Sequence, residues 1–128
     1  MLNALNMELS DLIKYLNNIG LPADYSVNSD KTKGNEIRGF DQLTISWKDN
    51  HISKSVQIYP EIFEMNIKRW NLGVCAWMDN EKGRQFWAET LIVKKSKSDI
   101  IAVALQEIKK GIERLKEISL KDQESTKH

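Results

Sequence analysis

The sequence predicts an α+β domain, in which an antiparallel meander sheet of about five strands is flanked by an N-terminal and a C-terminal amphipathic helix. Three observations predict this fold. Apolar residues near both ends of the chain recur at the three- and four-residue spacing of a helix face. Between them, the period changes to the two-residue alternation of half-buried strands. Short polar turns separate the alternating segments, so neighbouring strands are expected to be antiparallel.

The N-terminal helix is expected from about residue 3 to residue 19. Its apolar residues fall on one helical face: Leu2, Leu5, Leu9, Leu12, Ile13 and Leu16. Gly20 can adopt the left-handed conformation that ends a helix, and Pro22 cannot continue one.

A first hairpin is expected after a polar, glycine-containing loop over residues 30–42. Residues 43–47 alternate apolar and polar side chains, as a half-buried strand does. Asp49-Asn50 suits a hairpin turn because both residues tolerate a positive φ. Residues 56–58 alternate again on the return strand, which Pro60 is expected to end.

The segment 62–70 fits two patterns. Phe63, Met65 and Ile67 alternate as in a strand, whereas Phe63, Ile67 and Trp70 have the spacing of a helix face. We favour the strand because it completes a run of hairpins.

Two further strands are expected over residues 74–78 and 86–93, joined by a turn at 80–83. A second helix follows, with Ser96 as its N-cap and Asp99 near its positive end. The buried stripe of this helix is predicted to be Ile101, Leu105, Ile108, Ile112 and Leu115.

Size and composition indicate one globular domain, expected over residues 1–121 and followed by a polar tail over 122–128. The chain has 128 residues, and its 19 Lys and Arg nearly balance its 18 Asp and Glu. Such a balance provides no strong field toward nucleic acid or an anionic membrane. Because Cys75 is the only cysteine, no intrachain disulfide can form. The sequence has no apolar run near the roughly 20 residues of a membrane-spanning helix and no basic signal region. We therefore expect a cytoplasmic protein without a membrane partner.

Strand pairing predicts which side chains share a face of the sheet. If Met78 lies opposite Phe86, and Ile67 opposite Ala76, the alternate residues separate into two sets. One set is apolar and suits a covering helix: Phe63, Met65, Ile67, Ala76, Met78, Phe86 and Ala88. The other is aromatic in the middle and charged at its edges: Glu64, Asn66, Lys68, Cys75, Trp77, Trp87, Glu89, Leu91 and Val93. The second set has the composition of a protein-binding patch. The alternative is that the C-terminal helix covers this set, and the sequence does not decide between the two.

The chain carries no catalytic, cofactor-binding or metal-binding signature. Cys75, His51 and His128 are its only cysteine and histidines and are far apart in the sequence, so no zinc site is expected. Cys75 is interpreted as a buried packing thiol. Pairing of the Glu64 and Glu89 carboxylates across the sheet is the alternative, but we interpret both residues as part of a solvated edge. Phosphate-binding glycine motifs are absent. We therefore expect a protein that is not an enzyme and has no cofactor or metal.

The leading functional hypothesis is a non-catalytic protein-binding module. It would be an inhibitor, such as a toxin-immunity or phage anti-defence protein, or an adaptor, with a protein partner that the sequence does not identify. The candidate contact residues are Trp77, Trp87, Glu64, Lys68 and Glu89. A homodimer is also compatible with the sequence.

Two alternatives remain at this stage. One is single-stranded nucleic-acid binding, because cations lie beside stacking surfaces. Its candidate residues are Lys68, Arg69, Trp70, Lys94 and Lys95. The other alternative is a small enzyme or ligand-binding domain, which no motif in the sequence supports.

Overall fold

The computed structural model describes residues 9–16, 21, 25–31, 41–64 and 66–120. In chain order, the elements are α1 (Leu9–Leu16), β1 (Ser26–Lys31), β2 (Asp41–Asp49), β3 (Ile52–Phe63), β4 (Asn66–Asn80), β5 (Gly83–Lys94) and α2 (Lys97–Lys116). The strands form one five-stranded sheet in sequential order, and each neighbouring pair is antiparallel. The predicted α+β class with an antiparallel sheet is therefore confirmed.

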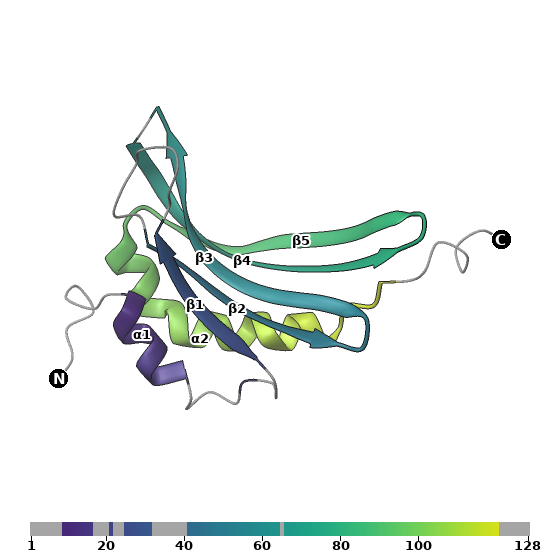
Figure 1. Cartoon of the computed structure of the whole chain (residues 1–128). Helices are drawn as coiled ribbons and strands as arrows, with labels where there is room; N and C mark the ends of the chain where they lie inside the picture. The colour runs from purple at the N-terminus through teal and green to yellow at the C-terminus, as the bar shows by residue number, and fades with distance from the viewer. Residues whose placement is uncertain (1–8, 17–20, 22–24, 32–40, 65, 121–128) are drawn as a thin grey trace.

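Both helices lie on the same side of the sheet (Figure 1). α2 packs mainly against β4 and also contacts β5 and β3, while α1 contacts β1, β2 and α2. We call this side the helix-covered face; on β4 and β5 it carries Val74, Ala76, Trp87 and Glu89. The opposite side is the open face; on the same strands it carries Cys75, Trp77, Phe86 and Ala88.

The hydrophobic core lies between the helices and the helix-covered face. Apolar residues of α1 and α2 meet those of the three central strands there: Leu9, Leu12, Leu16, Leu43, Ile45, Val56, Ile58, Leu72, Val74, Ile100, Ile101, Ala104, Ile108, Ile112 and Leu115. Gly111 lets α2 approach closely, because a Cβ at this position would lie 2.9 Å from Val74 Cγ1. The predicted N-cap is confirmed: Asp99 N donates to Ser96 Oγ at 3.1 Å. Within the predicted stripe, Leu105 is only half-buried.

The strand boundaries differ from the prediction around Pro60, which lies inside β3 and does not end it. The pairing of β2 with β3 ends at Leu43 and Ile58, so Pro60 is on a stretch that pairs with β4 alone. There its missing N–H is tolerated. The segment 62–70 is extended, but it is not a separate strand: it contains the end of β3, a turn at Glu64 with φ 50° and the start of β4.

The prediction also missed β1. Its sequence, Ser-Val-Asn-Ser-Asp-Lys, has a single apolar residue, so it lacks the alternation that predicts a strand. The ends of the predicted loop 30–42 belong to β1 and β2, while residues 32–40 lie outside the described residues. The predicted helix 3–19 is described over Leu9–Leu16. The tail 122–128 also lies outside the described part of the chain, and the single domain over 1–121 stays a prediction.

The predicted register of the last hairpin is wrong by one residue. Trp77 pairs with Phe86 and Ala76 with Trp87, because Asn80 pairs with Gly83 across a tight turn of two residues. Since side chains alternate between faces, a shift of one residue moves every side chain of one strand to the other face.

The shift divides the face that was predicted to be apolar. Ala76 is buried on the helix-covered face, whereas Phe86 and Ala88 are exposed on the open face. Phe63 is also exposed, at the far end of the β3–β4 hairpin. Ile67 pairs with Ile62 and not with Ala76, because β3 and β4 turn back on each other at Glu64.

Candidate functional site

The open face contains a pocket of about 410 Å³ over β3, β4 and β5. Three side chains give it an aromatic wall: Tyr59 from β3, Trp77 from β4 and Phe86 from β5. Trp77 and Phe86 are direct cross-strand partners, so their side chains leave the sheet next to each other. Phe86 is 60% exposed, the largest exposed fraction of any large apolar side chain described.

Two residues with small side chains, Gly73 and Ala88, leave the space that forms the base of this pocket. Gly73 lies beside the register shift between Leu72 and Gly73, where β5 contains an additional residue. A Cβ at Gly73 would lie 3.1 Å from the backbone oxygen of Glu89 and 3.8 Å from the ring of Tyr59. Together with Ala88, the glycine leaves space beside the aromatic wall.

A polar contact lies below the base of this pocket, between Cys75, which lines the pocket, and the buried Ser55. Ser55 Oγ and Cys75 Sγ are 3.0 Å apart, on directly paired residues of β3 and β4. Gln57 Nε2 donates to Ser55 Oγ at 3.2 Å and lies 4.0 Å from the sulfur. Cys75 is half-buried with polar neighbours, and it is not the buried packing thiol that the sequence had suggested. Alternation along β4 explains this difference, because Cys75 shares its face with Trp77 and not with the buried Val74 and Ala76.

Charged groups lie at one end of the pocket. Arg84 Nε donates to Asp79 Oδ1 at 2.8 Å, and its guanidinium lies over Trp77, 5.8 Å from the ring centroid. The hydrogen bond from Arg84 lowers the pKa of the Asp79 carboxyl, and nearby Lys48 acts in the same direction. The same bond raises the pKa of Arg84. The pair therefore stays ionised at neutral pH and orients the guanidinium on the tryptophan.

Two of the predicted contact residues lie on the other side of the sheet. Trp87 and Glu89 are on the helix-covered face, where Arg114 of α2 reaches both of them. The structure therefore separates Trp87 from Trp77. The cause is the one-residue error in the predicted register.

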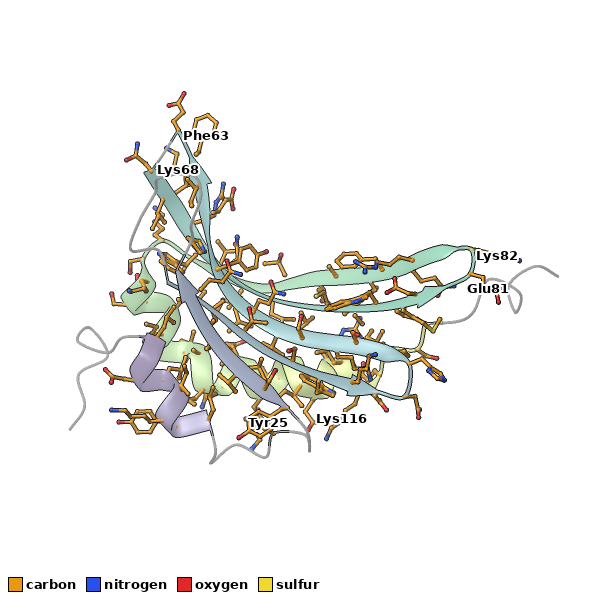
Figure 2. All side chains as sticks on the ribbon, in the orientation of Figure 1. Tyr25, Phe63, Lys68, Glu81, Lys82 and Lys116 are labelled. Atoms are coloured by element: carbon orange, nitrogen blue, oxygen red, sulfur yellow. The ribbon has the colours of Figure 1, made fainter. Side chains whose placement is uncertain are left out.

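The other two predicted contact residues lie away from the pocket. Glu64 is in the β3–β4 turn, and Lys68 Nζ lies 5.8 Å from the centroid of the Phe63 ring. Figure 2 shows Phe63 and Lys68 at the far end of this hairpin, away from the helices. Of the five predicted contact residues, only Trp77 lines the pocket.

The residues of the nucleic-acid alternative also have other contacts. Arg69 forms an ion pair with Glu61 at 3.0 Å. Trp70 is only 3% exposed, so its ring is not available for stacking on a base. Lys94 is the Cα partner of Trp70, and Lys95 is exposed beyond the end of β5. Lys97 lies over the Trp70 ring, 6.0 Å from its centroid.

Catalytic groups do not gather among the described residues. Glu64 is in a turn, whereas Glu89 lies within β5 opposite Val74, so the two carboxylates are not paired across the sheet. His51 precedes β3, and Cys75 pairs with Ser55, about 13 Å further along that strand. No group of three or more His, Cys, Asp or Glu in this part of the chain could hold a metal ion. Neither described helix has the length and apolarity needed to cross a membrane.

Comparisons with protein-family models, with curated proteins and with solved structures find no match to this chain. The open face is therefore interpreted from its own residues. Sequence reasoning missed Tyr59, Gln57 and the exposure of Phe86. The sequence carries no signal for Phe86 at the turn, because Glu81 and Lys82 are not the residue types that favour a two-residue hairpin turn.

Proposed function

We propose that this chain is a cytoplasmic, non-catalytic protein-binding module that binds its partner through the open face of β3, β4 and β5. An inhibitor, an immunity protein or an adaptor would act in this way. One observation carries the proposal: Phe86 is largely exposed directly opposite Trp77, beside a pocket and beneath no other described element.

The residue types at this pocket favour a protein partner. Tryptophan, tyrosine and arginine dominate the binding energy of protein interfaces, and here Trp77, Tyr59 and Arg84 lie around one depression. Burying Phe86 would remove a large apolar side chain from water, which contributes about 1.5–3 kcal/mol for full burial. Asp79 holds Arg84 in place, so little side-chain entropy remains to be lost on binding.

The surroundings of the pocket favour specificity for shape over charge. Arg84 is neutralised by Asp79, and Arg69 by Glu61, so the described open face has little net charge. Its lining offers the side-chain amide of Gln57 as a neutral hydrogen-bonding group. A partner that inserts an apolar or aromatic side chain with a neutral polar group would complement it.

The experiment compares two phenylalanines with nearly equal exposure. Phe86 at the pocket is 60% exposed and Phe63 at the β3–β4 tip is 58% exposed. Partners are captured from the native host with the wild-type chain and then titrated against Phe86→Ala, Trp77→Ala and Phe63→Ala. We expect Trp77→Ala to lose about thirtyfold in affinity or more, which corresponds to about 2 kcal/mol. Phe86→Ala should also weaken binding, and Phe63→Ala should not.

Circular dichroism of each variant separates binding from folding. The proposal requires that the variants with lost affinity remain folded. A partner that binds Phe86→Ala at full strength but loses affinity for Phe63→Ala would move the contact to the β3–β4 tip and contradict the proposal.

A further inference from the structure

β5 is an edge of the sheet, and no described element pairs with its outer side. It has 12 residues, about twice the usual strand length. Most of its side chains are at least partly exposed, including Phe86 and Val93. A long, exposed edge strand offers unpaired N–H and C=O groups to another strand.

Only part of this edge is regular. From Gly83 to Thr90, the pairing with β4 is uninterrupted, and the register then shifts where β5 contains its additional residue. Lys94 and Lys95 follow at the end of the strand. Bulges and lysines are the devices that prevent edge pairing, so any added strand should pair with the stretch 84–90.

This stretch is complementary to itself. In an antiparallel pairing of two copies centred on Trp87, residues whose numbers are equally far from 87 lie opposite each other on the same face. On the open face, Phe86 of each copy then lies opposite Ala88 of the other, a large side chain against a small one. Arg84 lies opposite Thr90, so no like charges meet.

The helix-covered side of the same register also fits. Trp87 lies opposite Trp87 of the second copy, and Gln85 lies opposite Glu89. Aromatic pairs at directly opposed positions are favourable cross-strand contacts, and an amide can donate to a carboxylate. Each Trp87 already has Arg114 over its ring, which shields the pair from the helix side.

The helices leave room for this pairing. Because α2 packs mainly against β4, two copies of α2 would be separated by three strand spacings, about 14 Å. A helix with its side chains is about 10 Å across, so the two helices do not clash. Their facing side chains have mixed charge, including Lys110, Glu113 and Glu117.

We propose that the chain forms a homodimer by antiparallel pairing of β5 with β5 of a second copy, centred on Trp87. The two sheets become one sheet of ten strands with both pairs of helices on one side and both open faces on the other. The two pockets then lie on one continuous surface, and Ala88 of each copy contacts Phe86 of the other. The dimer does not depend on the proposed protein-binding function.

The first experiment measures the oligomeric state by sedimentation velocity from micromolar to submillimolar protein. The wild-type chain should be a dimer in the upper part of this range. Ala88→Lys should shift it to a monomer, because Ala88 is exposed and an edge lysine opposes strand pairing. Ser26→Lys places the same charge on β1, at the opposite edge of the sheet, and should remain a dimer. A wild-type chain that stays monomeric throughout, or a dimer that survives Ala88→Lys, would overturn the proposal.

The second experiment tests the register. In a Cys75→Ser background, which removes the thiol opposite Ala88, the double variant Phe86→Cys/Ala88→Cys should form an intermolecular disulfide under mild oxidation. Neither single variant should do so efficiently. A cysteine at position 86 alone would lie opposite Ala88 of the second copy, and a cysteine at position 88 alone would lie opposite Phe86. Equal cross-linking of the single variants, or a dimer whose double variant does not cross-link, would overturn the register. Loss of partner binding by Trp77→Ala with the dimer intact would separate the two proposals, since Trp77 is not on β5.

Discussion

Arg114 and Glu89 join α2 to β5: Arg114 Nε donates to Glu89 Oε1 at 2.9 Å. The same guanidinium lies 5.3 Å from the centroid of the Trp87 ring and forms a second ion pair with Glu117. These hydrogen bonds raise the pKa of Arg114, with that to Glu89 contributing most. The contact identifies the face to which Trp87 belongs, and it makes this tryptophan part of the helix–sheet packing.

Trp87 and Phe86 are adjacent in the sequence, but their truncation should have different effects on stability. Trp87→Ala should lower the free energy of unfolding by about 2 kcal/mol, below the 3–5 kcal/mol of a fully buried ring because Trp87 is half-buried. Phe86→Ala should change it by less than about 1 kcal/mol, because Phe86 is mostly exposed. Urea midpoints for the two variants measure the difference. Equal losses would contradict the assignment of the two faces.

Gly111 supports the close approach of α2 to the sheet. Gly111→Ala should gain up to about 1 kcal/mol of helix propensity but lose about 1–3 kcal/mol through overpacking against Val74 and Leu91. We therefore expect a net loss of stability, measured by thermal or urea unfolding. Val74→Ala in the same chain should reduce that loss, because it removes the atom that the new methyl group meets. A stabilised Gly111→Ala variant would show that the helix can move away at little cost.

The buried stripe of α2 can be tested at two of its residues, with an exposed residue of the same helix as the control. Ile108 is fully buried, so Ile108→Ala should cost about 2–5 kcal/mol. Leu105→Ala should cost less, because Leu105 is half-buried. Lys109 is exposed on the same helix, and Lys109→Ala should change stability by less than about 0.5 kcal/mol. Similar urea midpoints for Ile108→Ala and Lys109→Ala would mean that another face of the helix is buried.

The sequence predicted the fold class because most of the elements have a strong local pattern. The α2 stripe, its Ser96 cap and the alternation in β2 and β5 are properties of short windows. β1 was missed because it is a strand through its pairing with β2, whereas its polar sequence has no alternation that indicates one. Pro60 was misjudged because only the tertiary arrangement reveals that the pairing of β2 with β3 has ended before it.

The candidate site depended on a property that no local pattern contains. Alternation predicted that β4 and β5 each have two different faces, but their relative register is determined by the turn at Glu81 and Lys82. A three-residue turn would place Trp77 opposite Trp87, whereas the two-residue turn places it opposite Phe86. Trp77 was therefore assigned correctly to a surface with Cys75, while Trp87 and Glu89 were assigned to the wrong one.

Lys54 is a buried cation on the helix-covered face. Its side chain is only 3% exposed, and its Nζ donates to Asp49 Oδ2 at 2.9 Å, while the Asp49 side chain is 56% exposed. The pair links the end of β2 to the start of β3 across the hairpin turn, and Lys54 also lies opposite the buried Ala76 of β4. Burying an ammonium group costs desolvation free energy. The attraction of its partner offsets this cost only while the partner remains in place.

Replacing the two members of this pair should therefore have opposite consequences. Asp49→Ala leaves the ammonium group without its carboxylate and should cost about 1–3 kcal/mol, less than a fully buried pair because water reaches the Asp49 side. Lys54→Met preserves most of the packed volume and removes the charge, so stability should be nearly unchanged or higher. The double variant should resemble Lys54→Met alone, because Asp49 then has no buried charge to neutralise. Urea denaturation of the four proteins measures this coupling. If Asp49→Ala cost nothing while Lys54→Met destabilised the protein strongly, the ion pair would not be what stabilises the buried Lys54, and the prediction would be wrong.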